Sequence, residues 1–348
     1  MKVGAPLFVV AFLPFFIAQI AQANEIEHCR LIEVDEERLA CYDNGMKVLS
    51  AEIEEEIVVA KKEAEEEGKE EALDSIMSEV PADSHSPFSD RLAREASMND
   101  SPFGILPHRR NYILPVTYNS KINTEPFQGA FGSVSMDEVE AKFQISFKAR
   151  ILEDILGGGD LWAAYTQQNW WQVYNSEESA PFRETNYEPE ALMVWDNDWK
   201  AGGFTNTLLT LGFVHQSNGR GEHLSRSWNR IIGGAAFEKD NFVIAARAWY
   251  RIPEDEEDDD NPNMDDYYGH GDVSLIYRLD DMELAAKIRN NLKGGGDNKG
   301  AVELEWTKPI NKRFKWYVQY FYGYGESLID YNVKTNRIGV GFALNNLL

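Results

Sequence analysis

The chain has 348 residues, a formal net charge of −24 at pH 7, and 43% hydrophobic residues. This length allows one large domain with an appendage, or two ordinary domains. The acidic balance excludes a general nucleic-acid-binding surface and would be repelled by bulk anionic lipid. Much of this charge is local, because residues 24–100 contain 23 acidic and 8 basic residues and so carry −15 of the total.

The first 23 residues predict a secretory signal peptide that is removed on export. Lys2 precedes an apolar run from about Ala5 to Ile20, and the small residues of the segment 21–23 flank a cleavage point before Asn24. A membrane anchor is the alternative, but the run contains two prolines and lacks a basic stop-transfer flank. No later stretch resembles a spanning helix, so a mature membrane protein would have to be a closed barrel.

Residues 24–100 are predicted to form an acidic, partly helical periplasmic extension and linker. Cys29 and Cys41 are the only cysteines, and in an exported protein they could close a small disulfide loop; two free thiols are the alternative. A charged stretch rich in helix formers follows. From Pro81 to Pro107 the chain is rich in Ser, Pro, Asp and Asn, as in a linker, which places the domain boundary near Ser101.

Residues 101–348 predict an all-β fold, an antiparallel transmembrane β-barrel of about 12 strands. In the segment 141–150, Phe143, Ile145 and Phe147 share one face, while charged side chains share the other. Runs with this alternation are about as long as a tilted transmembrane strand and are separated by polar loops. The runs lie near 112–118, 141–150, 161–173, 190–196, 207–217, 227–238, 242–252, 271–279, 282–291, 301–307, 314–324 and 337–344.

Aromatic residues near the ends of these runs support a membrane barrel, because interfacial belts would place them there. They are Trp170, Trp171, Trp195, Trp199, Trp249, Tyr250, Trp316 and Tyr317. A soluble sandwich or lipocalin-like barrel also has alternating strands, with the apolar face inward. The membrane barrel is favoured because charged residues such as Lys142 and Arg230 lie on polar faces that suit a filled, ion-paired lumen.

A candidate site for acyl transfer lies at 215–229. His215 and Ser217 share a strand face with Leu209, Leu211 and Phe213, so they would face whatever bathes the apolar side. If the following strand pairs as a hairpin, Asn229 lies beside His215 on that face. A serine nucleophile, a histidine base and an orienting group then meet. Asn suits a lipid-facing position, where a carboxylate would be costly to desolvate.

Gln167 is a second polar residue on an apolar face. It shares its parity with Leu161, Ala163, Tyr165 and Trp171, so an amide would face hydrocarbon. A lone polar defect near the interface is one interpretation. Burial against a symmetry mate would satisfy its hydrogen bonds. We therefore predict a two-fold dimer interface containing Gln167.

Several long motifs resemble the outer membrane phospholipase A family of Gram-negative bacteria. They are HQSNGR followed by SRSWNR, with YTQQNWWQ, NSEESAPFRETNYEPE and YGYGESLIDYN, and the resemblance covers roughly Ser101 to Leu348. It implies a twelve-stranded outer-membrane barrel that is active as a homodimer and needs Ca²⁺. The implied activity is hydrolysis of the sn-1 and sn-2 acyl esters of phospholipids and of lysophospholipids, which is a reaction of lipid degradation.

The resemblance also implies roles for individual residues. Ser217 corresponds to the nucleophile, His215 to the general base and Asn229 to its orienting partner. The backbone N–H of Gly219 would serve the oxyanion together with a calcium-polarised water. Gln167 corresponds to the family's dimer-interface glutamine.

The calcium ligands implied by the family form an all-oxygen set suited to a hard cation. They are the carbonyl of Arg220, the hydroxyl of Ser225 and the carbonyl of Ser179 from the facing subunit. Such a site is complete only when two chains meet, which makes dimerisation an activity switch.

The sequence departs from the family at Glu222 and His223, which stand where an Asp-Pro pair is common, and this puts a second calcium site in doubt. Asp259 or Asp260 remains a candidate ligand there; the acidic stretch 254–260 is otherwise a solvated loop. Two alternatives stay open at this point. One is a catalytically silent outer-membrane channel or scaffold, and the other is a lipid acyltransferase.

Overall fold

The computed structural model describes residues 88, 91–92, 95, 104–131, 135–255, 257, 259–311, 313–345 and 347. The chain divides into two compact units, Met1–Asp83 and Ser84–Leu348, and all described residues belong to the second. The predicted signal peptide, Cys29 and Cys41 lie outside the described residues. The predicted division at residues 23 and 100 therefore stays a prediction.

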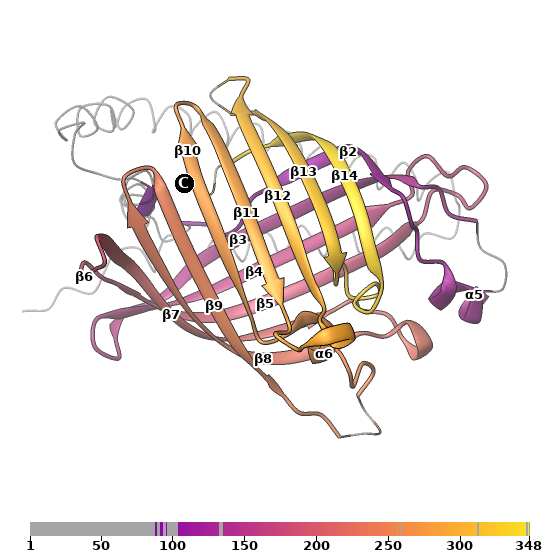
Figure 1. Cartoon of the computed structure of the whole chain (residues 1–348), viewed down its shortest axis with the longest axis horizontal. Coiled ribbons are helices and arrows are strands. Elements are labelled where there is room, and N and C mark those ends of the chain that lie inside the picture. The colour runs from indigo at the N-terminus through magenta and orange to yellow at the C-terminus, as the bar shows by residue number, and fades with distance from the viewer. Residues whose placement is uncertain are drawn as a thin grey trace, which may run out of the picture. The chain divides into compact units, whose positions relative to one another are not determined.

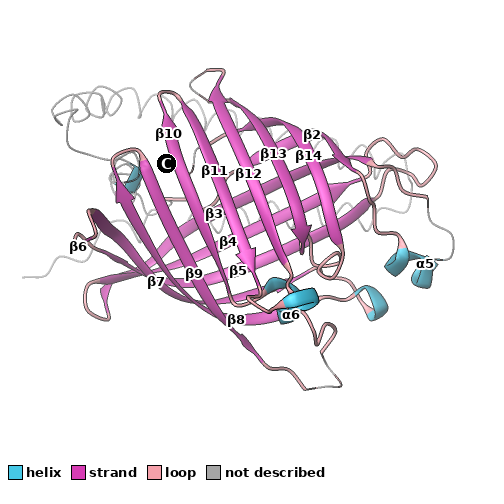
Figure 2. Cartoon of the chain, in the orientation of Figure 1, coloured by secondary structure: helices cyan, strands magenta, loops and turns pink. Residues whose placement is uncertain are grey.

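Twelve long antiparallel strands close into a barrel (Figures 1 and 2), which confirms the predicted all-β fold. Neighbours in the sequence pair throughout, and the pairing of β14 with β2 completes the circle. The strands are β2 (Tyr112–Asn119), β3 (Val139–Ile155), β4 (Gly159–Trp171), β5 (Phe182–Asp196), β7 (Phe204–Ser217), β8 (Ser227–Lys239), β9 (Phe242–Ile252), β10 (Gly271–Leu279), β11 (Met282–Asn290), β12 (Gly300–Pro309), β13 (Lys315–Tyr324) and β14 (Lys334–Ala343). Two-residue strands, β1 (Leu106–Pro107) and β6 (Lys200–Ala201), pair with β3 and β7.

Strand β5 is longer than the sequence predicts, since it begins at Phe182 and not near residue 190. Its first half alternates buried Glu184, Asn186 and Glu188 with less buried residues of the outer face. The inner positions are polar because they line the lumen, so the usual contrast between an apolar and a polar face is weak there. Hydrophobic alternation alone therefore misses this half of the strand.

The connections at one end of the barrel carry four short helices among the described residues. These are α5 (Glu125–Phe131), η2 (Glu222–Leu224), α6 (Asp265–Tyr268) and η3 (Gly295–Asp297), which connect β2 to β3, β7 to β8, β9 to β10 and β11 to β12. The opposite end has tight turns, such as Asp240–Asn241 between β8 and β9. No helix in the described part of the chain is long and apolar enough to cross a membrane.

The two faces of the barrel wall differ as the sequence predicts. Large apolar side chains such as Leu211 and Phe213 are exposed on the outer face. The lumen holds buried ion pairs, among them Arg183 with Glu140 at 3.0 Å and with Asp330 at 2.7 Å. Because buried charges are tolerated only when they are paired, this network explains how the interior remains filled and polar.

The aromatic-belt prediction is wrong for three of the eight residues. Trp170, Trp249 and Tyr317 are buried and point into the barrel. Their sequence neighbours Tyr250 and Trp316 are exposed on the outer face. Since successive side chains of a strand point to opposite faces, only one member of each adjacent aromatic pair can reach the lipid.

Candidate active site

The β7–β8 hairpin places His215 directly opposite Asn229. The Nδ1 atom of His215 lies 2.9 Å from the Oδ1 atom of Asn229, which is hydrogen-bonding distance. This contact follows from the register, because directly opposed residues of an antiparallel pair have neighbouring Cβ atoms on the same face. The sequence-based expectation that Asn229 lies beside His215 is therefore met.

His215 and Ser217 lie on the outer face of the barrel, at the end of β7 that leads into the β7–β8 loop. Preceding residues of the same parity, Leu211 and Phe213, are exposed and apolar. Val214, of the opposite parity, is fully buried. The histidine and the serine are thus directed to the lipid side and not to the lumen.

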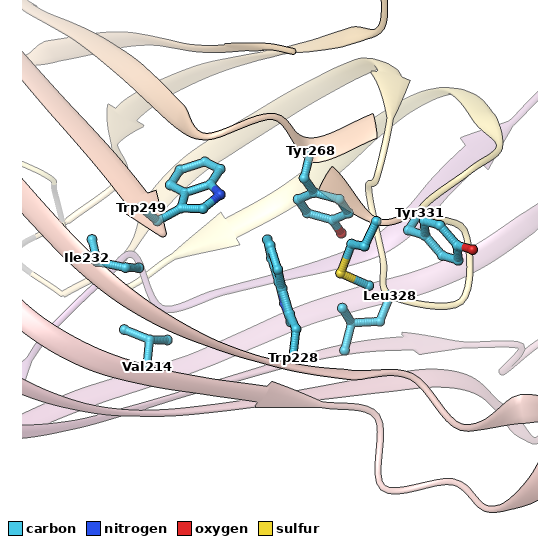
Figure 3. Close-up of a cluster of buried hydrophobic side chains, with 8 residues drawn as sticks. Val214, Trp228, Ile232, Trp249, Tyr268, Leu328 and Tyr331 are labelled. Carbon is cyan, nitrogen blue, oxygen red and sulfur yellow. The ribbon is translucent and has the colours of Figure 1, made fainter. Parts of the chain in front are cut away.

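A cluster of buried aromatic and aliphatic residues supports the inner side of the same strands (Figure 3). Val214 on β7 and Trp228 and Ile232 on β8 are its members within the hairpin, where they alternate with the outer residues. The Trp228 indole donates a hydrogen bond to Gln216 at 2.8 Å and packs edge-on against Tyr268 of α6. Burial raises the pKa of Tyr268 to about 12, so its hydroxyl stays neutral. Dense packing behind both strands holds the hairpin, and with it His215 and Asn229, in place.

Ser217 is the cross-strand partner of Ser227 on β8 and of Tyr187 on β5. Between the two described residues Ser217 and His215 there is no side-chain hydrogen bond. The structure therefore brings His215 and Asn229 into contact and leaves Ser217 two residues farther along the same face. Catalytic hydrogen bonds are often long in free enzymes and tighten when substrate binds.

The β7–β8 loop is held closed by Asn218. Its Oδ1 atom accepts hydrogen bonds from the backbone N–H groups of Arg220 and Arg226, and its Nδ2 atom donates to the carbonyl of Leu224 at 2.7 Å. Within the loop that Asn218 closes, Gly219 has a φ of +64°, a conformation that favours glycine. Within the described chain its N–H has no hydrogen-bond partner, so it is available to an incoming oxygen.

The contacts of the loop distinguish the two acidic candidates. The Ser225 hydroxyl donates a hydrogen bond to Asp260 of the β9–β10 connection. Asp259 is instead engaged by Arg251 at 2.6 Å and by the backbone N–H of Asn261. Asp260 is thus the carboxylate that faces the predicted ligand set. No cluster of three or more His, Cys, Asp or Glu residues suited to a metal occurs in the described part of the chain.

The remaining predicted ligands lie on two loops. Arg220 is in the β7–β8 loop, and its side chain donates to the carbonyls of Phe182 and Arg183, which fastens the loop to the start of β5. Ser179 lies in the β4–β5 connection with a φ of +59°. Glu222 and His223 form part of η2.

Gln167 lies on the outer face of β4 with hydrogen-bond partners within its own strand. Its Oε1 atom accepts from the Tyr165 hydroxyl and its Nε2 atom donates to Asn169, both at 2.9 Å. An amide has two N–H donors and two acceptor lone pairs, so one of each remains for a further partner. The amide that the sequence places toward hydrocarbon is therefore half satisfied.

One residue of the site was missed by sequence reasoning. Glu254, in the acidic connection after β9, accepts a hydrogen bond from Asn229 Nδ2 at 3.1 Å. The sequence indicates only a solvated acidic loop there. The sequence signal that could have found Glu254 is its parity. Ile252 is the β9 partner of Asn229, and Glu254 follows Ile252 by two residues, so both lie on the same face.

These features define a class of protein, a membrane barrel that carries a hydrogen-bonded histidine and asparagine on its apolar outer wall. The sequence model of the Phospholipase A1 family matches residues 88–344. The chain is 38% identical over 257 residues to the Phospholipase A1 of Escherichia coli strain K12, covering 74% of this chain and 86% of that protein. It is 40% identical over 280 residues to a putative phospholipase A1 of Neisseria meningitidis serogroup B, covering 76% of this chain and 72% of that protein.

Solved structures agree with this assignment. The outer membrane phospholipase A of Escherichia coli has a TM-score of 0.67 and 38% identity, covering 71% of this chain and all of that one. The outer membrane phospholipase dimer of Salmonella typhi with bound calcium has a TM-score of 0.68 and 36% identity, covering 73% of this chain and 98% of that one. The chain belongs to the phospholipase A1 family. It is an outer-membrane enzyme that hydrolyses phospholipids.

Proposed function

We propose that this phospholipase cleaves acyl esters with a triad of Ser217, His215 and Asn229 on the lipid-facing outside of the barrel. The observation that carries the proposal is the 2.9 Å contact between His215 Nδ1 and Asn229 Oδ1, on the same outer face as Ser217. An amide oxygen only accepts hydrogen bonds, so it holds the proton on Nδ1. The Nε2 atom is then free to act as a base.

The acyl transfer follows from this arrangement. Ser217 Oγ attacks the ester carbonyl carbon while His215 Nε2 takes its proton. The backbone N–H of Gly219 stabilises the negative oxygen of the tetrahedral intermediate. When the C–O ester bond breaks, His215 returns the proton to the departing lysophospholipid oxygen. Water, activated by the same base, then releases the fatty acid from Ser217.

The β7–β8 loop and the β9–β10 connection together offer oxygen donors that fit a calcium ion. Ser225 and Asp260 are adjacent oxygen donors, and the carbonyl of Arg220 belongs to the same loop. Oxygen-only ligand sets of this kind are what Ca²⁺ prefers. When bound, calcium would supply positive charge beside the developing oxyanion. The Salmonella typhi relative is a dimer with bound calcium.

We further propose that the active form is a homodimer, with Gln167 in the interface and the carbonyl of Ser179 of the partner subunit completing the calcium site. The free donor and acceptor of the Gln167 amide support a contact with a symmetry mate. A hydrogen bond between amides within a membrane adds about 1 kcal/mol. Activity then depends on two chains meeting, which protects the membrane from continuous hydrolysis.

Product analysis tests the triad. Refolded protein is incubated with phospholipid in detergent micelles, with calcium and with a chelator, and fatty acid and lysophospholipid are measured. We expect calcium-dependent release of both and loss of release in Ser217→Ala, with the folded barrel retained on heat-modifiability gels. Full release in Ser217→Ala would overturn the triad, and transfer of acyl groups to another lipid would favour an acyltransferase.

A further inference from the structure

We propose that Glu254 is a positioning residue that fixes the orientation of the Asn229 amide and, through it, the tautomer of His215. This inference rests on the proposed triad. The carboxylate accepts a hydrogen bond from Asn229 Nδ2 at 3.1 Å, and the other end of the same amide contacts His215 Nδ1 at 2.9 Å. The three side chains form one chain of hydrogen bonds that ends on the catalytic base.

The strand register explains why Glu254 reaches the site. Asn229 of β8 is paired with Ile252, the last residue of β9. Glu254 follows Ile252 by two residues, which is the spacing of one strand face. Its side chain therefore continues the outer row of β9 beyond the end of the strand and lies over the Asn229 amide.

The orientation of an asparagine amide has to be set by its partners, because its two ends have nearly the same shape. An ionised carboxylate only accepts hydrogen bonds, so Glu254 can face only the NH₂ end of Asn229. The carbonyl end must then face His215, whose Nδ1 atom has to be the protonated one. A reversed amide would set its oxygen against the carboxylate and lose that hydrogen bond, and its NH₂ group would face Nδ1, which suits only the other histidine tautomer.

The location of the charge is also favourable. A carboxylate at position 229 would have to be desolvated on the lipid face of β8. Glu254 is partly exposed in the connection after β9, where water solvates it. Its charge still polarises the Asn229 amide and favours the imidazolium that forms when His215 takes the serine proton, since hydrogen bonds in a chain strengthen one another.

The next acidic residue provides a matched control. Asp255 lies in the same connection and is exposed, and its backbone carbonyl, not its side chain, accepts the N–H of Asp259. Replacing it with Asn removes one negative charge from the same loop without touching the Asn229 amide. A general effect of loop charge on calcium or lipid binding would therefore appear in both Asp255→Asn and Glu254→Gln.

The first experiment compares steady-state kinetics of the full chain in phospholipid–detergent micelles at saturating calcium. In Glu254→Ala we expect kcat to fall about tenfold, as for a group that assists a general base, with KM within about twofold. The kcat of Glu254→Gln, which keeps an acceptor but not the charge, should fall less than that of Glu254→Ala. The kcat of Asp255→Asn should match that of the wild type. Unchanged kcat in Glu254→Ala, or an equal fall in Asp255→Asn, would overturn the proposal.

A double-mutant cycle shows whether Glu254 acts through Asn229. In an Asn229→Ala background, Glu254→Ala should cause no further fall in kcat, because the residue it orients is gone. Independent, multiplicative losses contradict the proposal. A normal kcat in Glu254→Ala with a higher calcium concentration for half-maximal activity also contradicts the proposal, because Glu254 would then serve the cation. If Ser217→Ala is inactive while Glu254→Ala is fully active, only this inference fails and the triad stands.

Discussion

Gln167 and Ser217 lie in one row across three strands, because each is a cross-strand partner of Tyr187. Gln167 of β4 pairs with Tyr187 of β5 on one side, and Ser217 of β7 pairs with it on the other. Neighbouring strands are about 4.8 Å apart, so the two residues are separated by roughly 10 Å on the outer face. A second barrel that contacts Gln167 would therefore border the lipid approaching Ser217.

Replacement of Gln167 by Ala should weaken the dimer. The loss of about 1 kcal/mol of hydrogen bonding across the interface corresponds to roughly a fivefold weaker association. Crosslinking of the micelle-bound protein with calcium measures the dimer yield, and activity per chain should fall in parallel. Gln128→Ala, at an exposed position of α5, is the control for the same chemical change. An unchanged dimer yield in Gln167→Ala would count against the interface.

Gly219 should tolerate no side chain. A Cβ atom there would lie 3.0 Å from Cε2 of Tyr187, and the φ of +64° is costly for other residues. Gly219→Ala should displace the N–H that we propose for the oxyanion and lower kcat about 10- to 100-fold with little change in KM. Gly221→Ala is the matched control in the same loop, because its φ is −107° and no atom lies within 4 Å of its Cβ position. Equal activities of the two variants would remove Gly219 from the mechanism.

Ser225 and Asp260 should govern the calcium requirement. Ser225→Ala and Asp260→Asn each remove an oxygen donor or its charge, so the calcium concentration for half-maximal activity should rise at least fivefold while kcat at saturation changes less. Calcium-dependent stabilisation against heat gives a second readout that needs no turnover. Asp259→Asn should leave calcium affinity nearly unchanged, because Asp259 is engaged by Arg251. A normal calcium response in Ser225→Ala would exclude it as a ligand.

The barrel was predictable from sequence because its signal has period two, and each strand must separate lipid from a polar lumen. The same parity rule places His215, Ser217 and Asn229 on one face. The hydrophobic contrast on which the rule depends is weak in the first half of β5, where inner Glu184, Asn186 and Glu188 alternate with outer Thr185, Tyr187 and Pro189. Adjacent aromatic pairs such as Trp249 and Tyr250 obey the rule, because alternation places them on opposite faces, and a single belt cannot contain both members.

Contacts between loops depend on more than the sequence pattern. Glu254 touches Asn229 because it continues the outer row of β9 beyond Ile252, which parity reveals only once the β8–β9 register is known. Asp260, and not Asp259, faces Ser225 because Arg251 holds the other carboxylate. Such choices depend on three-dimensional competition between neighbouring charges, which no spacing in the chain records.

The lumen should make the folded barrel sensitive to acid. Burial alone would raise the pKa of Glu326, in the β13–β14 connection, but Arg337 at 2.9 Å and Lys142 at 3.0 Å lower it to about 2. A lowered carboxyl pKa contributes stability above the unfolded-state value near 4.5, and this is lost as pH falls toward 2.

The loss amounts to roughly 3 kcal/mol at most, since one pKa unit corresponds to about 1.4 kcal/mol. The free energy of unfolding in urea, measured in micelles between pH 7 and pH 3, should decrease in this window. Glu326→Gln should be less stable at pH 7, because it leaves buried cations without their partner, and its stability should depend less on pH. If the free energy of unfolding of Glu326→Gln changes with pH as steeply as that of the wild type, the acid sensitivity belongs to other carboxylates.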